Sequence, residues 1–261
     1  MRSFNQTQFA MQPTDLLNQE GNSVEVLSRS AFVTGRKVGI LLLLQLAAAL
    51  TLPFILAHAI TVGSPAFLTA VAKESFQVRT AVLLSFVGSA LTVYLGITAF
   101  PVFRRYSKSA ALLFLVVCAV SCTLDVVQAG TIMSMLAISN RFVEAGAAAD
   151  SELYQVVAAA VASARRSAHA TQLLAIGAWM FVFYVSLLRF QLVPRVLAVA
   201  GVIGVALQFT GVTLMMFLGY PSIGQMAMPL LPIQIAVAVW LIAKGFRVHP
   251  AAPNRREFSA A

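Results

Sequence analysis

Six long apolar segments, almost free of charged residues, constrain the fold of this chain more than any other feature. They cover residues 38–60, 80–100, 110–138, 170–188, 196–218 and 227–243. A helix of about 20 apolar residues crosses the hydrocarbon core of a bilayer. Within that core, only helices and closed barrels satisfy their own backbone hydrogen bonds. The sequence therefore predicts an all-α fold, a polytopic transmembrane helical bundle of six spans.

The composition and charge of the chain support this class and exclude another. Hydrophobic residues make up 59% of the 261 residues and charged residues 10%, whereas a soluble domain averages about 45–50% and about 25%. The net charge of +9 would suggest nucleic acid in a soluble protein. Here the basic residues lie in short segments between apolar runs, without interleaved aromatic residues or a glycine-rich phosphate loop. We therefore exclude nucleic acid and expect the lipid bilayer as the main partner.

The distribution of Lys and Arg predicts the orientation. With the N-terminus in the cytoplasm, thirteen of the 18 basic residues lie in the two tails and in the loops after the second and fourth spans. The other five lie on the opposite side. Cytoplasmic loops carry the excess of Lys and Arg, so we expect both termini in the cytoplasm and an even number of spans.

Three regions are expected along the chain. Residues 1–37 are polar and lack sustained periodicity, which predicts a disordered cytoplasmic tail. Residues 38–246 form the six-span domain, and residues 247–261 a basic cytoplasmic tail. Within the domain, residues 150–166 carry apolar residues on one helical face but are too few to span. We expect an extracytoplasmic amphipathic helix there, either lying on the surface or, as the lack of a breaker before Arg189 favours, continuing into the fourth span.

Asp125 is the only Asp, Glu, Lys or Arg within the six apolar segments. A charged residue at the centre of a span costs about 2.5–3.5 kcal/mol on insertion scales, so such residues usually have a partner or a function. Ser121, Cys122 and Gln128 share its helical face, which predicts that this face points into the bundle. Two interpretations remain open: a structural carboxyl bonded to neighbouring helices, or a ligand, proton or cation site in a wet cavity.

Other polar residues are candidates for the same pocket. Amides at a similar depth, near the midplane, could line it, or could only join helices at about 0.6 kcal/mol per contact; they are Gln128, Gln172, Gln208 and Gln234. Two histidines lie toward the extracytoplasmic side and could ligate a haem or a metal: His58 and His169. Their spacing does not demand it, so we predict no cofactor and no metal, with haem as the alternative. Four charged residues at that surface could contact headgroups or form a gate above the pocket: Glu74, Arg79, Arg165 and Arg166.

Three functions are compatible with these residues. The first is a non-enzymatic membrane protein that binds or moves a small or lipidic ligand in an intramembrane pocket near Asp125. The second is a membrane-embedded enzyme or haem redox protein that uses His58 and His169. The third is a sensor or an accessory subunit in which the bundle is mainly a scaffold. The oligomeric state stays open, because Gly201 and Gly204 lack the four-residue spacing of small residues that favours helix dimers.

Two runs of the sequence resemble a known family. KESFQVRTAVLLSFVGSALTVYLGITAFPVFRRYSKSAALLF (residues 73–114) is similar to the first block of the bacterial domain of unknown function 4386. HATQLLAIGAWMFVFYVSLLRFQLVPRVLAVAGVIG (residues 169–204) is similar to its second block. The resemblance covers roughly residues 37–247 and implies a multi-pass bundle of the bacterial inner membrane with unassigned activity. His169 and Pro194-Arg195 match positions of the pattern, and no catalytic role comes with them.

Overall fold

The computed structural model describes residues 13–56, 67–146, 151–220 and 223–247, and this part of the chain is helical without strands. The helices are α1 (Pro13–Leu56), α2 (Phe67–Lys73), α3 (Ser75–Tyr106), α4 (Lys108–Ala145), α5 (Ser151–Arg189), α6 (Arg195–Leu218), α7 (Ile223–Ala227) and α8 (Leu230–Lys244). Six of them are long and apolar enough to cross a membrane, the last as a continuous stretch from Gln225 to Lys244. The predicted all-α bundle of six spans is confirmed.

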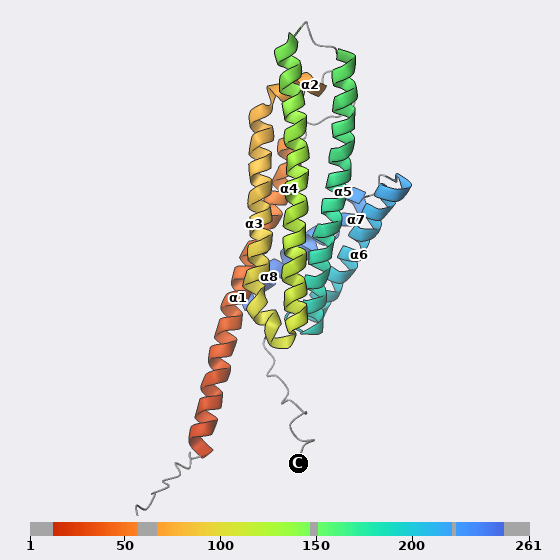
Figure 1. Ribbon diagram of the computed structural model, residues 1–261. Coiled ribbons are helices and arrows are strands. Elements are labelled where there is room, and N and C mark those ends of the chain that lie inside the picture. Colours follow the sequence, from red (N-terminus) through yellow and green to blue (C-terminus); the bar gives the residue numbers. More distant parts are fainter. Residues whose placement is uncertain (1–12, 57–66, 147–150, 221–222, 248–261) are drawn as a thin grey trace, which may run out of the picture.

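The helices pack in an order that places α4 at the centre of one face. α3 and α5 both pack along α4, and α1 packs against α3 and α8. α6 packs between α5 and α8. The short α2 lies against α4 near the end of the bundle that is at the top of Figure 1. Side chains of three consecutive long helices, α3, α4 and α5, can therefore meet at one depth.

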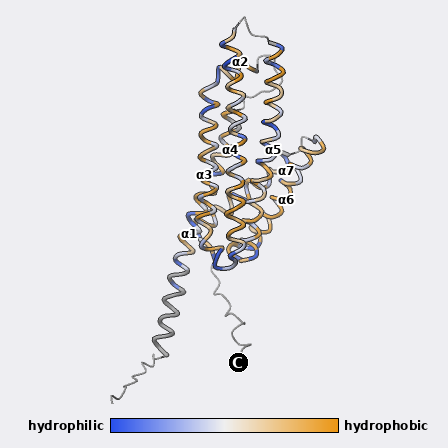
Figure 2. The backbone as a smooth tube through the Cα atoms, in the orientation of Figure 1, coloured by the Kyte–Doolittle hydropathy of each residue, from blue (hydrophilic) through white to orange (hydrophobic). Residues whose placement is uncertain are grey.

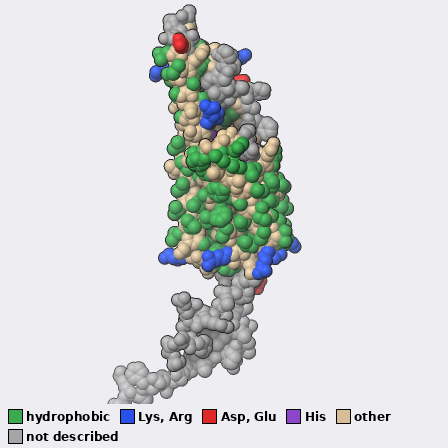
Figure 3. Space-filling view, turned by 90° about the vertical axis from the view of Figure 1, so that its right-hand side faces the viewer, with side chains coloured by type: hydrophobic (Ala, Val, Ile, Leu, Met, Phe, Trp, Pro, Cys, Tyr) green, Lys and Arg blue, Asp and Glu red, His purple; other side chains and the backbone are tan. Residues whose placement is uncertain are grey.

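One end of the bundle carries most of the basic residues, and we call it the basic end. Here α3, α5 and α8 finish and α4 and α6 begin, with Arg104, Arg105, Lys108, Arg189, Arg195 and Lys244. Lys and Arg side chains gather along the lower rim of a wide apolar belt (Figure 3). The hydropathy of the residues changes at the same place, from hydrophobic within the helices to hydrophilic at the turns of this end (Figure 2). We call the opposite end the distal end.

α4 and α5 are longer than a bilayer requires. They contain 38 and 39 residues, which at 1.5 Å per residue correspond to about 57 Å, against about 30 Å for the hydrocarbon core. Both extend past α6 and α8 at the distal end (Figure 1). Because α5 is unbroken from Ser151 to Arg189, the predicted amphipathic helix continues into the fourth span, the second of the two alternatives.

The first helix begins earlier than the sequence pattern predicts. α1 starts at Pro13, so the expected disordered tail does not hold over residues 13–37, and residues 1–12 lie outside the described part. Proline suits the first position of a helix. Further along α1, Ala31 is 1% exposed within the core. Helix-start signals and tertiary packing thus outweigh the weak periodicity of this polar segment.

Aromatic side chains fill the bundle toward the basic end. The ring of Phe103 lies 5.3 Å from that of Phe114 and 6.2 Å from that of Phe183, between ring centroids. Trp179 and Tyr184 are each 1% exposed and extend this packing along α5. Large rings bury much apolar surface and pack in tilted or offset pairs. This half of the bundle is therefore closed by packed side chains.

Two glycines allow α1 to approach the end of α8 closely. A Cβ on Gly39 would lie 2.6 Å from the Ala238 carbonyl oxygen, and one on Gly35 would lie 2.7 Å from the Gly245 Cα. Gly35 and Gly39 have the four-residue spacing that lets helix backbones approach, here between helices of the same chain. That spacing is the sequence signal for this contact.

Replacing Gly39 by alanine should destabilise the bundle, because the new methyl group meets the backbone of α8. Overpacking of this kind costs about 1–3 kcal/mol, against a gain in helix propensity of about 1 kcal/mol. The matched control is Gly130→Ala on α4, where nothing lies within 4 Å of the added Cβ. Thermal unfolding in detergent should show a lower midpoint for Gly39→Ala and an unchanged or higher one for Gly130→Ala. Equal midpoints would contradict the close contact.

Candidate functional site

Asp125 lies on the face of α4 that packs into the bundle. Ser121, Asp125, Ala129 and Ile132 follow one another on this face at helical spacing, and all are buried. The Asp125 side chain is 8% exposed. A carboxyl group placed there must find its hydrogen bonds within the protein, because lipid offers none.

Asp125 receives its hydrogen bonds from the two helices that flank α4. The Ser89 hydroxyl on α3 lies 2.7 Å from Oδ2, and the Gln172 Nε2 on α5 donates to Oδ1 over 2.6 Å. One carboxyl group therefore joins three spans at a single depth. Gln172 was a candidate from the sequence, whereas Ser89 was not. The only sequence signal for Ser89 is its place among the small polar residues of α3, with Ser85 and Thr92.

The contact with Ser89 accommodates the carboxyl in either protonation state. Ser89 Oγ also lies 2.9 Å from the Ser85 carbonyl oxygen, and a hydroxyl has only one proton to donate. If Ser89 donates to Asp125, Oδ2 acts as the acceptor, which suits an ionised carboxylate. If Ser89 donates to Ser85, a protonated Asp125 can donate to Ser89 Oγ. An amide at position 125 could make the second arrangement as well.

The hydrogen bonds continue from Gln172 to a histidine at the surface. Gln172 Oε1 lies 3.2 Å from His169 Nδ1, and Gln128 Nε2 lies 3.1 Å from the same nitrogen. Because Gln172 gives its NH₂ group to Asp125, its oxygen faces the imidazole, and Nδ1 carries the proton that it accepts. Gln128 then fits best with its amide turned by half a rotation, so that its oxygen also accepts from Nδ1.

This assignment places a hydrogen-bond acceptor at the exposed end of these side chains. His169 is exposed, and among the described residues its Nε2 has no hydrogen-bond partner. With the proton on Nδ1, Nε2 of the neutral ring is an acceptor. We call Ser89, Asp125, Gln128, His169 and Gln172 the polar cluster. It runs from a buried carboxyl to an exposed imidazole, and its free capacity lies at the exposed end.

The depth of the polar cluster follows from helical rise. Gln172 lies about 26 Å from Arg189 at the basic end, and Arg165 about 10 Å further toward the distal end. The hydrocarbon core is about 30 Å thick. If Arg189 marks one edge of this core, Asp125, paired with Gln172, lies in its distal third rather than at the midplane that the sequence suggests.

Two of the predicted amides lie apart from the polar cluster. Gln208 on α6 donates from Nε2 to the Leu173 carbonyl oxygen over 3.2 Å, which joins α6 to α5. Gln234 is buried on α8, and neither residue is hydrogen-bonded to the polar cluster in the described structure. A further amide, Gln45 on α1, donates to Thr92 Oγ1 over 2.8 Å. Gln208 and Gln45 behave as contacts between helices.

The four charged residues of the predicted gate do not form one group. Glu74 and Arg79 lie at the start of α3, and Arg165 and Arg166 lie on α5, with α4 between these helices. No ion pair within 4.0 Å joins them in the described part of the chain. Arg79 and Arg166 are exposed, while Arg165 and Glu74 are half-buried. Each of the half-buried pair keeps one buried polar atom without a partner, Arg165 Nε and Glu74 Oε2.

The redox hypothesis requires His58 and His169 to act together. His58 lies outside the described residues, so this pairing stays a prediction. Within the described ranges, no three His, Cys, Asp or Glu side chains gather closely enough to hold a metal ion.

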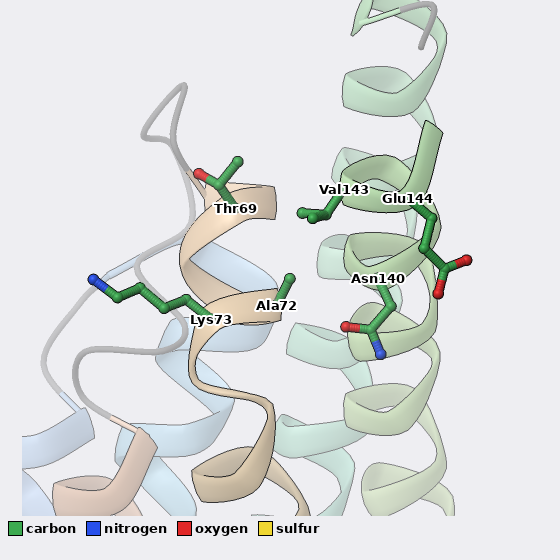
Figure 4. A pocket seen from close by; sticks show the side chains of 6 residues that line it. All are labelled: Thr69, Ala72, Lys73, Asn140, Val143 and Glu144. Atoms are coloured by element: carbon green, nitrogen blue, oxygen red, sulfur yellow. The ribbon is translucent and has the colours of Figure 1, made fainter. Parts of the chain in front are cut away.

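The surface hollows of the structure are formed by other residues. One of about 390 Å³ lies at the distal end between α2 and α4, lined by Thr69, Ala72, Lys73, Asn140, Val143 and Glu144. Thr69 and Ala72 face Val143 across it, while the charged groups of Lys73 and Glu144 point away from the gap (Figure 4). Another of about 310 Å³ lies near the basic end between α4 and α5. The first hollow presents mainly uncharged groups and lacks the convergent polar atoms of the cluster.

Substitutions at Asp125 should separate the shape of the side chain from its hydrogen bonds. Asp125→Asn can still accept from Gln172 and donate to Ser89, so the unfolding midpoint should change little. Asp125→Leu leaves the Gln172 NH₂ group without its partner, which costs about 1–3 kcal/mol. Thermal unfolding should rank Asp125→Leu well below Asp125→Asn, with Thr123→Leu on the exposed face of α4 as the control. A more stable Asp125→Leu protein would show that these bonds add nothing to folding.

Comparison with known proteins places the chain in a family. Residues 38–245 match the family model described as Domain of unknown function (DUF4386). No curated protein and no solved structure matches the chain. The match covers most of the chain and includes α3 to α6, which carry the polar cluster and the Gln208 contact. The protein is therefore an integral membrane protein of unassigned activity, and the chain belongs to the family of domain of unknown function 4386.

Proposed function

We propose that this protein binds a small or lipidic molecule within the membrane, at the exposed end of the polar cluster. The observation that carries the proposal is the path of the hydrogen bonds through the bundle. They lead from the buried carboxyl of Asp125, through Gln172, to the exposed imidazole of His169. An ionisable residue within a membrane helix is by default a hypothesis for a functional site.

A purely structural role accounts less well for the exposed end of the polar cluster. Gln208 illustrates a simple helix contact, one amide bonded to one backbone carbonyl. Its Oε1 is buried without a partner, as is the second polar atom of the Gln128 amide, so such an atom does not distinguish the two sites. The polar cluster differs because its five side chains lead to an exposed residue, His169, whose Nε2 has no partner among the described residues. A ligand that donates a hydrogen bond to Nε2 would use this capacity.

The surroundings favour a ligand that enters from the bilayer. On α4, Val126 and Val127, next to Asp125 in the chain, are 46% and 51% exposed and turn toward lipid. An amphiphile could place its apolar part against this surface and its polar part against Gln128 and His169. Ligand sites of this kind combine apolar walls with a few placed polar groups.

The packing of aromatic side chains favours binding of a ligand over its transport through the bundle. Between the polar cluster and the basic end, Trp179, Phe183 and Tyr184 are each 1% exposed. These packed rings leave no room for a molecule to move through the bundle. Movement across the membrane would require a second arrangement in which this packing opens.

For the orientation, we propose that the basic end faces the cytoplasm of a bacterial inner membrane, with both termini there. The support is the charge distribution, since Lys and Arg concentrate where α3, α5 and α8 end. α1 begins and α8 ends on this same side (Figure 1). The polar cluster then opens toward the extracytoplasmic leaflet.

The binding proposal can be tested by identifying what co-purifies with the protein. Mass spectrometry of the extracted protein should detect a molecule enriched with the wild type and reduced about tenfold in Asp125→Leu and His169→Leu, a loss that corresponds to about 1.4 kcal/mol. Gln208→Leu is the matched control, because it removes an amide outside the polar cluster and should retain the molecule. Equal amounts in all four proteins, each checked for folding, would refute the proposal.

The orientation can be tested by cysteine labelling in whole cells. Single cysteines at Ser109 near the basic end and at Thr69 near the distal end replace polar residues on helices α4 and α2. We expect a membrane-impermeant maleimide to label the cysteine at 69 in intact cells and the cysteine at 109 only after permeabilisation. Both natural cysteines, Cys118 and Cys122, lie within α4 and are replaced by serine in the background. The reverse labelling pattern would show that the basic end faces outward.

A further inference from the structure

Arg165 lies one helical turn from the exposed end of the polar cluster. Arg165, His169 and Gln172 are spaced by four and three residues on α5, so they share one face of the helix. Arg165 is half-buried, and its Nε is buried without a hydrogen-bond partner. A buried donor left without a partner costs about 1–3 kcal/mol, more when it is charged. This face of α5 therefore presents an unsatisfied cationic donor beside His169.

No acidic side chain of the described structure neutralises Arg165. An ion pair within 4.0 Å is absent there, and the next residue, Arg166, adds a second positive charge. Two adjacent arginines repel one another unless an anion lies between or beside them. A guanidinium is well suited to carboxylates and phosphates, because its Nε and Nη groups can donate in parallel to two oxygens.

The depth of Arg165 matches that of lipid phosphates. By helical rise it lies about 36 Å from Arg189, whereas a bilayer measures about 30 Å across its hydrocarbon core and about 40–45 Å with its headgroups. If Arg189 lies in one headgroup layer, Arg165 lies in the other. His169, one turn below, then lies at the boundary of the apolar core.

We propose that the ligand of the polar cluster carries a phosphate group, held by Arg165 with Arg166 and adjoining His169. This inference rests on the proposed function and adds the chemical class of the ligand. The phosphate accepts from the guanidinium of Arg165, a hydroxyl of the ligand donates to His169 Nε2, and any acyl chain lies along the lipid-facing surface of α4 and α5. A phospholipid headgroup and a free phosphate ester share this chemistry.

General contact between arginine and headgroups would not single out Arg165. Long basic side chains near helix ends reach the interface and touch many lipids there. Arg79 represents this behaviour: it lies toward the distal end on α3, is exposed, and has no buried donor that lacks a partner. Arg79 is therefore the matched control for Arg165.

The test measures binding of three probes to the purified full chain in a neutral detergent by calorimetry. The probes are dioctanoyl phosphatidylglycerol, which carries both a phosphate and free hydroxyls, dioctanoylglycerol, which has the same chains and a hydroxyl without the phosphate, and inorganic phosphate. We expect phosphatidylglycerol to bind at least about tenfold more tightly than dioctanoylglycerol. Arg165→Gln should remove this difference, Arg79→Gln should preserve it, and Arg165→Lys, which keeps the charge but loses the paired donors, should preserve part of it.

The outcomes separate this inference from the proposed function. Equal binding of both lipids, lost in Asp125→Leu, would overturn the phosphate inference and leave the binding proposal intact. Lipid binding unaffected by Asp125→Leu and His169→Leu would overturn both. Arg165-dependent binding of inorganic phosphate as tight as that of phosphatidylglycerol would support the phosphate site and identify a free phosphate ester as the source. Equal loss of phosphatidylglycerol binding in Arg165→Gln and Arg79→Gln would show general headgroup contact and overturn the inference.

Discussion

The hydrogen bonds of the Asp125 carboxyl hold the arrangement of the central three helices. A polar side chain within the hydrocarbon core has no solvent to bind, so its partners must come from neighbouring helices. Ser89 and Gln172 supply them from opposite sides of α4. This fixes the rotation of α3 and α5 about their own axes, because either helix turned by one residue would move its donor to another face. The positions of His169 and Gln128 then follow from Gln172.

The polar cluster lies between two apolar cores of the bundle. Toward the basic end, aromatic rings and the close approach of Gly35 and Gly39 to α8 form a dense core. Toward the distal end, α4 and α5 continue beyond α6 and α8 (Figure 1), and a smaller apolar core holds them, with the rings of Phe142 and Tyr154 5.4 Å apart. Apolar packing without polar atoms resists rearrangement, whereas hydrogen bonds between side chains can exchange partners. The polar cluster thus lies where the structure can respond to a bound molecule.

Much of the fold could be predicted from the sequence, because each span can be recognised on its own. Its apolar length has to match the thickness of the bilayer, whatever the rest of the chain does. The continuous α5 was also favoured, since no breaker interrupts it. The buried face of Asp125 followed from helical periodicity. Its partners did not follow: Gln172 and Gln208 looked alike in the sequence, but one bonds to the carboxyl and the other to a backbone carbonyl. The face of a helix on which a residue lies can be read from the sequence, whereas the identity of neighbouring helices depends on tertiary packing.

The start of α1 and the role of Ser89 escaped prediction for related reasons. A polar segment with weak periodicity reads as a tail, although proline, here Pro13, suits the first position of a helix. A serine within a span reads as a small packing residue until a carboxyl is placed 2.7 Å from it. The environment of Arg165 could not be predicted from the sequence either. Its sequence position indicates an interfacial residue, while the structure shows a partly buried side chain with one donor unused beside His169. An unused donor next to an unused acceptor is what a ligand with both an anionic and a hydroxyl group would satisfy, and neither residue alone would indicate it.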